Sequence, residues 1–233
     1  DGNDGITGGD GIDVITGGLG ADNLAGGGGD DTFIAVAADL VPGETIDGGD
    51  DTDTLRIDGG GSASLTGVTL TDLEGNEHTL ADYTAEGKTV VLEWFNPDCP
   101  FVKKHHEANK SMYETYRSAK ENDVVWLAIN SGKPGNQGTG QERNERAVKE
   151  YGIEYPVLLD ESGKVGKMYQ AKTTPHMYII DGEGVLVYAG AIDNNPRFDL
   201  GDVNYVSQAI GEMAHGKAIS ESETRPYGCS VKY

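Results

Sequence analysis

Cys99 stands where a predicted strand gives way to a predicted helix, a place that favours a reactive thiol. The β-branched run at 89–92 predicts a buried strand. Pro100 suits the first position of a helix, because its missing N–H costs nothing there. Residues with helical spacing follow it: Val102, His105, Ala108, Met112, Tyr116 and Ala119. Free N–H groups and the dipole at such a helix start stabilise a thiolate, the nucleophilic form of cysteine.

Aspartates that recur every nine residues near the N-terminus point to metal chemistry. Copies of the repeat begin at Gly8, Gly17 and Gly26, residues 1–7 are the remainder of an earlier copy, and a looser copy covers 48–56. Glycine lets the backbone turn tightly and point carbonyl oxygens inward, and each aspartate adds a hard anionic oxygen. Together they offer the oxygen shell that Ca²⁺ prefers. The pattern resembles the G-G-x-G-x-D-x-U-x signature of calcium-binding RTX repeats.

The RTX resemblance implies an all-β parallel β-roll in which each turn uses two repeats. Calcium would lie between repeats i and i+2, so that Asp4 faces Asp22 and Asp13 faces Asp31. The further candidate calcium ligands are Asp10, Asp30, Asp50 and Asp53. The apolar position of each repeat would fill a thin core with Ile6, Ile15, Leu24 and Phe33. The alternative is a disordered glycine- and aspartate-rich linker, above all without calcium, when the carboxylates repel one another.

Charge and glycine content change sharply along the chain. Residues 1–61 hold 14 acidic residues, one basic residue and 18 of the 35 glycines, whereas the whole 233-residue chain has a net charge of −21. We therefore expect a β-roll at 1–61, a linker at 58–64, a second domain at 65–216 and a tail at 217–233. This acidity argues against nucleic acid and anionic membranes as partners.

The ends and the hydropathy of the chain add two expectations. The sequence begins at Asp1 without a methionine, so we expect a processed or truncated product. It holds no apolar run of 18 residues, so we expect no membrane span.

The second domain has the alternating pattern of an α/β fold. A hairpin is expected from 68–73 and 77–80, and strand 89–95, a helix reaching about Lys120 and strand 124–130 form a parallel βαβ unit. A helix at 141–151 should end at Gly152. The remaining predicted elements are strands at 155–160, 173–181 and 184–188 and a helix at 202–215.

This domain resembles the redoxin and peroxiredoxin-like branch of the thioredoxin superfamily. The resemblance rests on Trp94-x-x-x-x-Cys99, Thr174-Pro175 before a strand, Ile192-Asp193 and the tail Gly228-Cys229-Ser230. It implies a thioredoxin-like fold in which a cis-proline loop, Thr174 and Pro175, packs beside Cys99. Two departures stand out: Val102 replaces the second cysteine of a Cys-x-x-Cys pair, and Asn96 replaces the threonine or serine of the peroxiredoxin signature.

The chain has one other cysteine, Cys229, in the predicted tail. With Val102 in place of a vicinal cysteine, Cys229 is the residue that could resolve an oxidised Cys99 within the chain. A static Cys99–Cys229 bridge and a free tail thiol are the alternatives.

Several basic residues and histidines near Cys99 invite a functional interpretation. Lys103, Lys104 and Arg143 could stabilise a thiolate, although solvated surface charge is the plainer interpretation. His105 falls on the apolar face and is expected to be a core histidine, and a copper or zinc site with Cys99 would draw on His106 or His176.

Two functions remain open on these grounds. The first is an extracytoplasmic thiol oxidoreductase that uses Cys99, with modest turnover of peroxides, on a calcium-binding module. The second is a calcium-dependent structural or self-assembling extracellular protein in which the redoxin domain is not catalytic. We expect calcium as a ligand, homo-oligomers through the open edges of the roll, and a secreted or periplasmic location.

Overall fold

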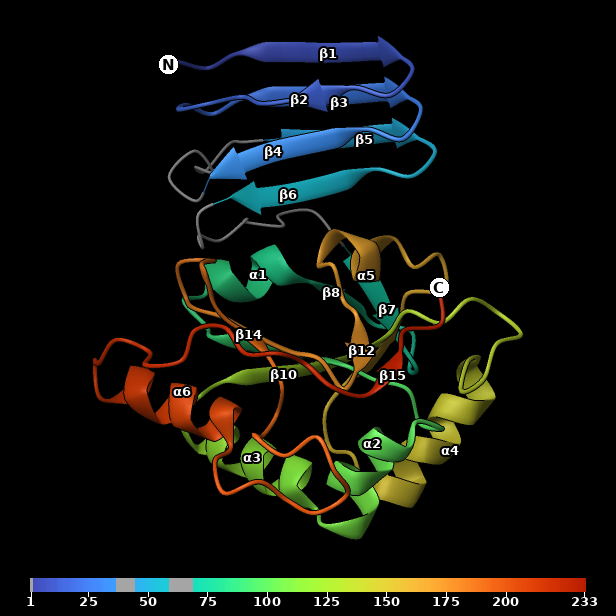
Figure 1. The fold of residues 1–233 in the computed structure, drawn as a ribbon, viewed down its shortest axis with the longest axis vertical. Helices are drawn as coiled ribbons and strands as arrows, with labels where there is room; N and C mark the ends of the chain where they lie inside the picture. The colour runs from blue at the N-terminus through green and yellow to red at the C-terminus, as the bar shows by residue number, and fades with distance from the viewer. Residues whose placement is uncertain (1, 37–44, 59–68) are drawn as a thin grey trace. The chain divides into compact units, whose positions relative to one another are not determined.

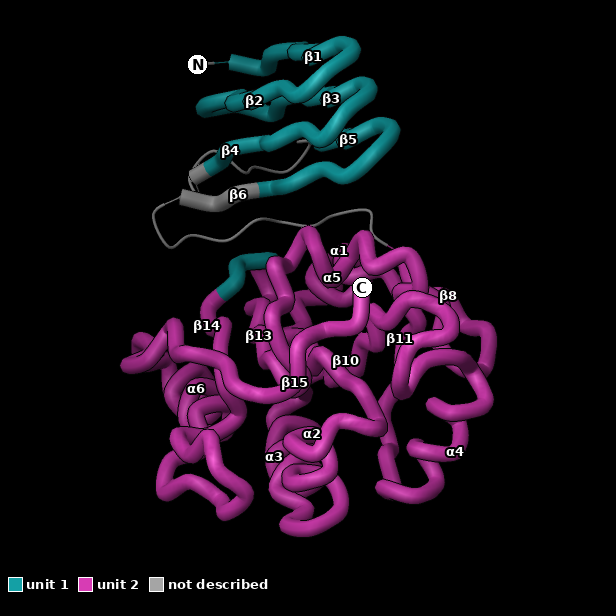
Figure 2. The backbone as a smooth tube through the Cα atoms, turned by 45° about the vertical axis from the view of Figure 1, so that its right-hand side comes forward, with its two compact units in different colours: residues 1–65, 184–186 teal, residues 66–183, 187–233 magenta. Residues whose placement is uncertain are grey.

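The computed structural model describes residues 2–36, 45–58 and 69–233 (Figure 1). Two compact units make up the chain (Figure 2). One unit contains residues 1–65 and 184–186, and the other contains 66–183 and 187–233. The predicted linker at 58–64 lies almost wholly outside the described residues.

The first unit consists of two small parallel sheets, and successive strands alternate between them. One sheet contains β1 (Gly5–Asp10), β3 (Asn23–Gly28) and β5 (Thr45–Asp50), in that order. The other contains β2 (Val14–Ile15), β4 (Thr32–Val36) and β6 (Thr54–Asp58). The pairing joins Ile6 to Leu24 and Ile15 to Phe33. Equivalent residues of repeats i and i+2 are therefore neighbours.

The apolar position of the repeat faces inward in this unit. Ile15, Leu24, Phe33 and Leu55 are buried, and Ile6 is half-buried. Ile12, Val14 and Leu19 are exposed. So few buried side chains contribute a small hydrophobic stabilisation, which leaves the unit dependent on its backbone ladders and its carboxylates.

The second unit is built on a seven-stranded mixed sheet of order β14-β13-β9-β10-β11-β7-β8. Its central strands, β9 (Val90–Trp94) and β10 (Val125–Asn130), are parallel, and β13 (Met177–Ile180) runs antiparallel to β9. The remaining strands are β7 (Thr69–Asp72), β8 (Glu77–Thr79), β11 (Val157–Leu159) and β14 (Leu186–Gly190). The predicted hairpin and the predicted parallel βαβ unit are confirmed.

Helices cover both faces of this sheet. Figure 1 shows α1 (Leu80–Ala85) and α5 (Lys164–Met168) on one side, with α3 (Ser111–Glu121), α4 (Gln141–Tyr151) and α6 (Tyr205–Ala214) on the other. Helix α4 has the predicted bounds and ends at Gly152, which has φ of 65°. Helices α1 and α5 are absent from the sequence prediction, because each is too short to show a clear apolar period.

The predicted helix from Cys99 to about Lys120 is wrong in one respect, because it is broken. It begins as α2 (Pro100–Lys103), continues as one π turn, η2 (Lys104–Ala108), and restarts as α3 after Lys110, whose φ is 53°. A π turn holds more residues than an α turn and so rotates the helix face. Three consecutive polar side chains are buried in this turn: Lys104, His105 and His106.

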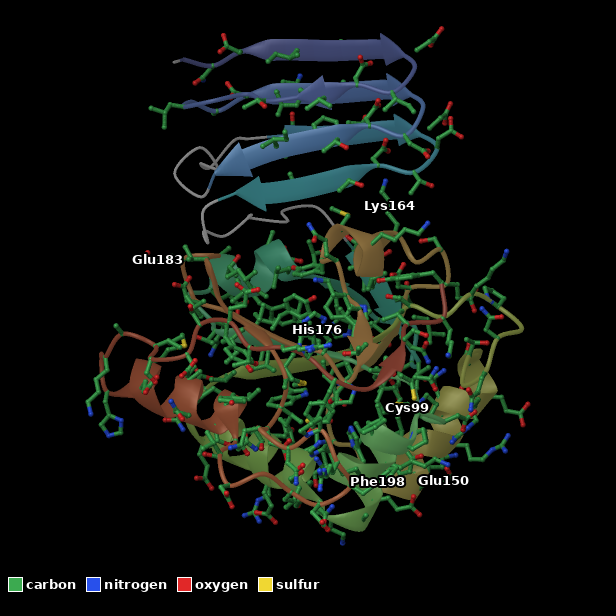
Figure 3. All side chains as sticks on the ribbon, in the orientation of Figure 1. Cys99, Glu150, Lys164, His176, Glu183 and Phe198 are labelled. Carbon is green, nitrogen blue, oxygen red and sulfur yellow. The ribbon has the colours of Figure 1, made fainter. Side chains whose placement is uncertain are left out.

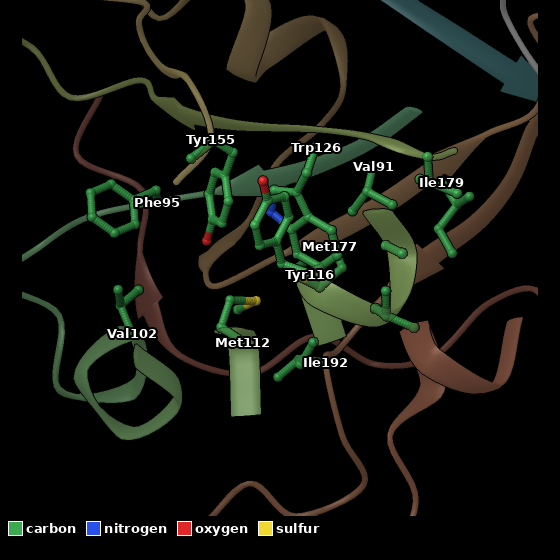
Figure 4. Close-up of a cluster of buried hydrophobic side chains, with 14 of the residues drawn as sticks. Val91, Phe95, Val102, Met112, Tyr116, Trp126, Tyr155, Met177, Ile179 and Ile192 are labelled. Carbon is green, nitrogen blue, oxygen red and sulfur yellow. The ribbon is translucent and has the colours of Figure 1, made fainter. Parts of the chain in front are cut away.

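The hydrophobic core of the second unit lies between the sheet and the α3–α6 layer. Val91, Trp126 and Ile179 from three neighbouring strands meet Met112 and Tyr116 of α3 (Figure 4). Cys99 and Val102 belong to the same buried cluster. This packing fixes the end of β9 and the start of α2, and with them the candidate site.

Candidate active site

Cys99 lies immediately before α2, at the end of the loop that follows β9 (Figure 3). The side chain is buried, with 2% of its surface exposed. It makes no capping hydrogen bond to the first helical turn; instead the thiol donates to the Thr174 carbonyl oxygen at 2.9 Å. The structure therefore places Cys99 at the predicted strand-to-helix junction, in an enclosed position.

The loop that contains Thr174 and Pro175 lies against this thiol. The peptide bond between the two residues is cis. Thr174 belongs to β12 (Thr173–Thr174), and its buried side-chain hydroxyl has no hydrogen-bond partner among the described residues. The sequence-based expectation that Thr174 and Pro175 form a cis-proline loop near Cys99 thus agrees with this geometry.

The tail that contains Cys229 is ordered against the same loop. Residues Cys229–Ser230 form strand β15, which runs antiparallel to β12, and Cys229 is paired with Thr174 (Figure 1). The Thr174 backbone is therefore in contact with both cysteines, through the Cys99 thiol on one side and the ladder on the other. The structure brings together Cys99, Cys229, Thr174 and Pro175, the four residues predicted for the thiol site.

The Cys229 thiol is strongly disfavoured as an anion. Burial, and then the hydrogen bond and charge of Cys99, raise the pKa of Cys229 to about 12. The hydrogen bond from Cys99 that contributes to this shift means that the two side chains are close enough to interact directly. Both cysteines carry free thiols here. The pair is thus in its dithiol state, with Cys99 enclosed and Cys229 half-buried.

The loop before Cys99 is held by side chains of α4 and of the loop preceding it. Arg143 makes an ion pair with Asp98, with Nη2 at 2.8 Å and Nε at 2.9 Å from Oδ1. Tyr151 donates to the Pro97 carbonyl at 2.6 Å, and Asn96 donates to Gln137. Because Asp98 would oppose a neighbouring thiolate, its pairing with Arg143 removes most of that opposition. Arg143 is consequently an engaged residue rather than a solvated charge.

A second ionisable cluster lies in the core beside the site. Glu93 of β9 is fully buried, and its carboxylate contacts His106 Nε2 at 2.6 Å, the Tyr155 hydroxyl at 2.8 Å and Trp126 Nε1 at 3.3 Å. Burial, and then the Glu93 charge, raise the pKa of Tyr155 well above its usual range. Each oxygen of Glu93 accepts a hydrogen bond, so this buried carboxylate is satisfied by neutral donors and one histidine.

The expectation that Lys104 is a solvated surface charge is wrong. Only 2% of the residue is exposed, and its Nζ lies 3.3 Å from the Asp193 carboxylate. The ammonium also donates to the Asn195 carbonyl at 2.8 Å and to the Tyr227 hydroxyl at 2.9 Å. The buried charge is therefore paired and fully hydrogen-bonded, as a buried ammonium requires.

The histidines do not assemble a metal site with Cys99. His105 is a satisfied core histidine, as expected: its Nδ1 contacts Ser111 at 2.7 Å and its Nε2 contacts the Tyr227 hydroxyl at 2.9 Å. His106 is paired with Glu93, and His176 Nδ1 accepts a hydrogen bond from the backbone amide of Lys172 at 3.3 Å. Across residues 2–36, 45–58 and 69–233, no three side chains of His, Cys, Asp or Glu converge as a metal-binding group.

In the first unit the repeat aspartates form a ladder. Asp22 Oδ1 accepts from the Asp4 amide at 2.8 Å, Asp31 Oδ1 accepts from the Asp13 amide at 2.8 Å, and Asp53 Oδ1 accepts from the Asp31 amide at 3.0 Å. The predicted pairs Asp4–Asp22 and Asp13–Asp31 are therefore neighbours. The other four predicted ligands, Asp10, Asp30, Asp50 and Asp53, are at least partly exposed.

One oxygen of this ladder suits a hard cation. Asp31 is 1% exposed, and its Oδ2 has no hydrogen-bond partner among residues 2–36, 45–58 and 69–233. The atom lies so close to Gly26 that a Cβ on this glycine would overlap it. A buried anionic oxygen without a donor is costly. Such an oxygen is a ligand type that calcium accepts. Among the described residues no three carboxylates converge, so backbone carbonyl oxygens would have to complete the shell.

The sequence analysis gave no structural role to Glu93, to Tyr227 or to Asp193, although Asp193 belongs to the Ile192-Asp193 pair of the resemblance. Glu93 lies within a continuous apolar strand, where a single acidic residue was a signal that could have been used. Asp193 and Tyr227 are loop and tail residues without periodic context, and nothing local to them indicates burial.

Comparisons with known proteins agree with this geometry. The AhpC/TSA family model matches residues 63–189. The thiol-disulfide oxidoreductase ResA of Geobacillus kaustophilus is 30% identical over 115 residues, which cover 49% of this chain and 60% of that protein. ResA of Geobacillus thermodenitrificans is 29% identical over the same shares. The chain thus spans less than two thirds of the length of these relatives.

Two solved structures resemble the chain. A hypothetical protein from Sinorhizobium meliloti has a TM-score of 0.63 and 29% identity, over 71% of this chain and 90% of that one. An uncharacterized conserved protein from Geobacillus kaustophilus has a TM-score of 0.64 and 26% identity, over 72% and 90%. The predicted thioredoxin-like α/β fold of the second unit is confirmed.

Proposed function

The chain belongs to the AhpC/TSA family, and from that premise we propose that it is a thiol-disulfide oxidoreductase whose reactive pair is Cys99 and Cys229. One observation carries the proposal. The Thr174 backbone accepts a hydrogen bond from the Cys99 thiol and is paired in a ladder with Cys229. Two cysteines far apart in the sequence thereby meet beside a cis-proline loop. The similarity to ResA supports the same class of reaction.

The reaction is a two-electron exchange between this pair and a substrate disulfide. Cys99, as the thiolate, attacks one substrate sulfur and expels the other as a thiol, which leaves a mixed disulfide on Cys99. Cys229 then attacks Cys99 and releases the second substrate thiol. The protein gives up two electrons and two protons and keeps one disulfide, while the substrate disulfide becomes two thiols.

The return reaction follows the same path in reverse. A reductant thiolate attacks Cys99 of the disulfide and expels Cys229, which takes up a proton because its pKa is raised to about 12. A second reductant thiol then breaks the mixed disulfide and frees Cys99.

Glutathione disulfide tests this function on the full chain. Non-reducing peptide maps of the wild type should show a Cys99–Cys229 link, and Cys229→Ser should stop at Cys99 bonded to glutathione. Separate glutathione adducts on both cysteines, without a link between them, would contradict the proposal. Addition of hydrogen peroxide instead measures peroxidase activity, which we expect to be modest because Asn96 stands where the peroxiredoxin signature has threonine or serine.

Calcium binding by the first unit is a second proposed function, and a specific observation favours it. The Asp31 Oδ2 atom is buried and has no hydrogen-bond donor in the part of the chain that the structure describes, and the surrounding segment 1–61 holds 14 acidic residues and a single basic one. The matching RTX pattern makes Asp4, Asp13, Asp22, Asp31 and Asp53 the side chains that would hold the ions. Bound calcium would supply charge neutralisation between adjacent turns of a β-roll.

Hydrogen exchange on the full chain tests the calcium proposal. Millimolar calcium should slow exchange in peptides covering β3 and β4, whereas the same concentration of magnesium should do so much less, because Mg²⁺ demands a stricter geometry. Equal exchange in calcium and in chelator would sink the idea.

The two functions together suggest an extracytoplasmic location. Repeats of this type bind calcium at the millimolar concentrations found outside cells, and a lasting disulfide is favoured there. Among the described residues, no helix is long and apolar enough to cross a bilayer. Strands β1 and β6 each end a sheet, and an exposed edge could pair with a further repeat or a second copy of the chain.

A further inference from the structure

The tail that contains Cys229 has an anchor two residues earlier, at Tyr227. The Tyr227 hydroxyl contacts Lys104 Nζ at 2.9 Å and His105 Nε2 at 2.9 Å, and it donates to Asp193 Oδ1. Its ring stacks edge-on against Phe101, with centroids 5.8 Å apart. Three of these contacts come from the helical segment that starts directly after Cys99. The tail is thus tied to the element that positions the reactive cysteine.

Gly228, which lies between Tyr227 and Cys229, allows the tail to approach the Thr174 backbone closely. Gly228 has φ of 144°, and a Cβ on it would overlap the Thr174 carbonyl oxygen. Only glycine lets the tail cross the Thr174 backbone at this distance. The next residue, Cys229, is then placed opposite Thr174, whose carbonyl oxygen holds the Cys99 thiol.

We propose that Tyr227 is a positioning residue: its hydroxyl, held by Lys104, His105 and Asp193, sets the effective concentration of the Cys229 thiol at Cys99. This inference rests on the proposed dithiol function. The network does not touch the reacting sulfur atoms, and it acts by keeping the tail docked. Docking and disulfide formation favour the same arrangement of the tail, so a substitution that undocks the tail of the dithiol form also lowers the equilibrium constant for the disulfide.

The buried partners of Tyr227 make the expected effect large. Lys104 and Asp193 are both buried, and hydrogen bonds to charged groups are the stronger class. Tyr227→Phe removes the hydroxyl and keeps the ring against Phe101. We expect the equilibrium constant for forming the Cys99–Cys229 disulfide to fall about 10- to 100-fold.

The experiment equilibrates the protein with glutathione buffers and counts free thiols by mass after acid quenching and alkylation. At equilibrium the two protein thiols pass two electrons and two protons to glutathione disulfide, which becomes two glutathione thiols. Tyr83→Phe is the matched control, because it also removes a tyrosine hydroxyl bonded to a histidine, His78, at 2.6 Å. The Tyr83→Phe constant should equal that of the wild type.

A second measurement reports on the docked tail without any disulfide. In the reduced protein Cys99 is enclosed, so Tyr227→Phe should speed its alkylation about 10-fold or more, and Gly228→Ala should do the same if Tyr227→Phe folds poorly. Equal constants and equal alkylation rates in Tyr227→Phe and the wild type would overturn the proposal. So would an equal loss in Tyr227→Phe and Tyr83→Phe. If the wild type forms no Cys99–Cys229 disulfide, the proposed function fails, and the alkylation rates alone decide on Tyr227.

Discussion

Replacement of Asp31 by asparagine should stabilise the first unit without calcium and remove the stabilisation that calcium gives. Asparagine keeps an oxygen that can accept from the Asp13 amide, as Asp31 Oδ1 does at 2.8 Å. It replaces the buried Oδ2, which has no donor, with an NH₂ group. Without calcium the substitution removes a buried, unpaired charge. With calcium it removes a ligand and puts a donor where the cation should bind.

The two effects have comparable sizes. A buried carboxylate without a partner costs several kcal/mol, and an unsatisfied buried amide costs about 1–3 kcal/mol, so Asp31→Asn should stabilise the calcium-free unit by roughly 1–3 kcal/mol. Calcium at 100 times its dissociation constant adds about 2.7 kcal/mol to the wild type. If the variant does not bind calcium, it lacks this stabilisation of about 2.7 kcal/mol, so calcium should raise exchange protection about 100-fold more in the wild type than in the variant.

Hydrogen exchange of peptides from β3 and β4, measured on the full chain in chelator and in calcium, measures this difference directly. Tryptophan fluorescence cannot do so, because both tryptophans lie in the second unit. Asp47→Asn is the charge-matched control: Asp47 is exposed, so its effect should be small and of one sign. If Asp31→Asn and Asp47→Asn alter protection equally in both conditions, the ligand argument is wrong.

Three further predictions concern the second unit. Lys104→Met should lower the free energy of unfolding by about 3–5 kcal/mol, since it leaves Asp193 buried and unpaired. In urea titrations the double variant Lys104→Met/Asp193→Asn should lose clearly less unfolding free energy than the sum of the losses in the two single variants. Burial by itself would raise the pKa of Asp72, but hydrogen bonds from His78 and Asn76 outweigh it and lower the pKa to about 2. The ionised Asp72 therefore stabilises the fold by about 2 kcal/mol above about pH 4, near the unfolded pKa, and this stabilisation is lost as pH falls through 2. The difference in unfolding free energy between wild type and Asp72→Asn should shrink between about pH 4 and pH 2. Arg143→Gln leaves the Asp98 carboxylate unpaired beside Cys99 and should slow Cys99 alkylation about 3- to 10-fold at neutral pH, an effect that added salt should reduce.

Local patterns predicted most of the second unit, and tertiary contacts explain the rest. Helix α4 and its Gly152 end follow from spacing and a C-terminal glycine, both properties of a few neighbouring residues. The burial of Lys104 follows from a π turn and from Asp193, neither of which has a local signal. The same holds for β15, a two-residue strand whose position depends on Gly228 and on the Tyr227 network. Cys99, the cis-proline loop and Cys229 as the partner of Cys99 were therefore predictable, but the strand pairing and the Tyr227 network that dock Cys229 were not.

The looser fourth repeat shows what the repeat requires physically. Asp51 stands where the other copies have Gly11, Gly20 and Gly29, all of which have positive φ. Asp51 adopts φ of 73°, a conformation that aspartate tolerates better than most residues, and its carboxylate accepts from the Gly29 amide at 3.2 Å. The Asp31 amide donates to the Asp53 carboxylate across 22 residues, whereas the equivalent bonds of the earlier copies span 18. The bond is therefore kept in spite of the insertion before β5. Backbone conformation and the ladder, rather than strict spacing or glycine itself, are what keep the aspartates in line.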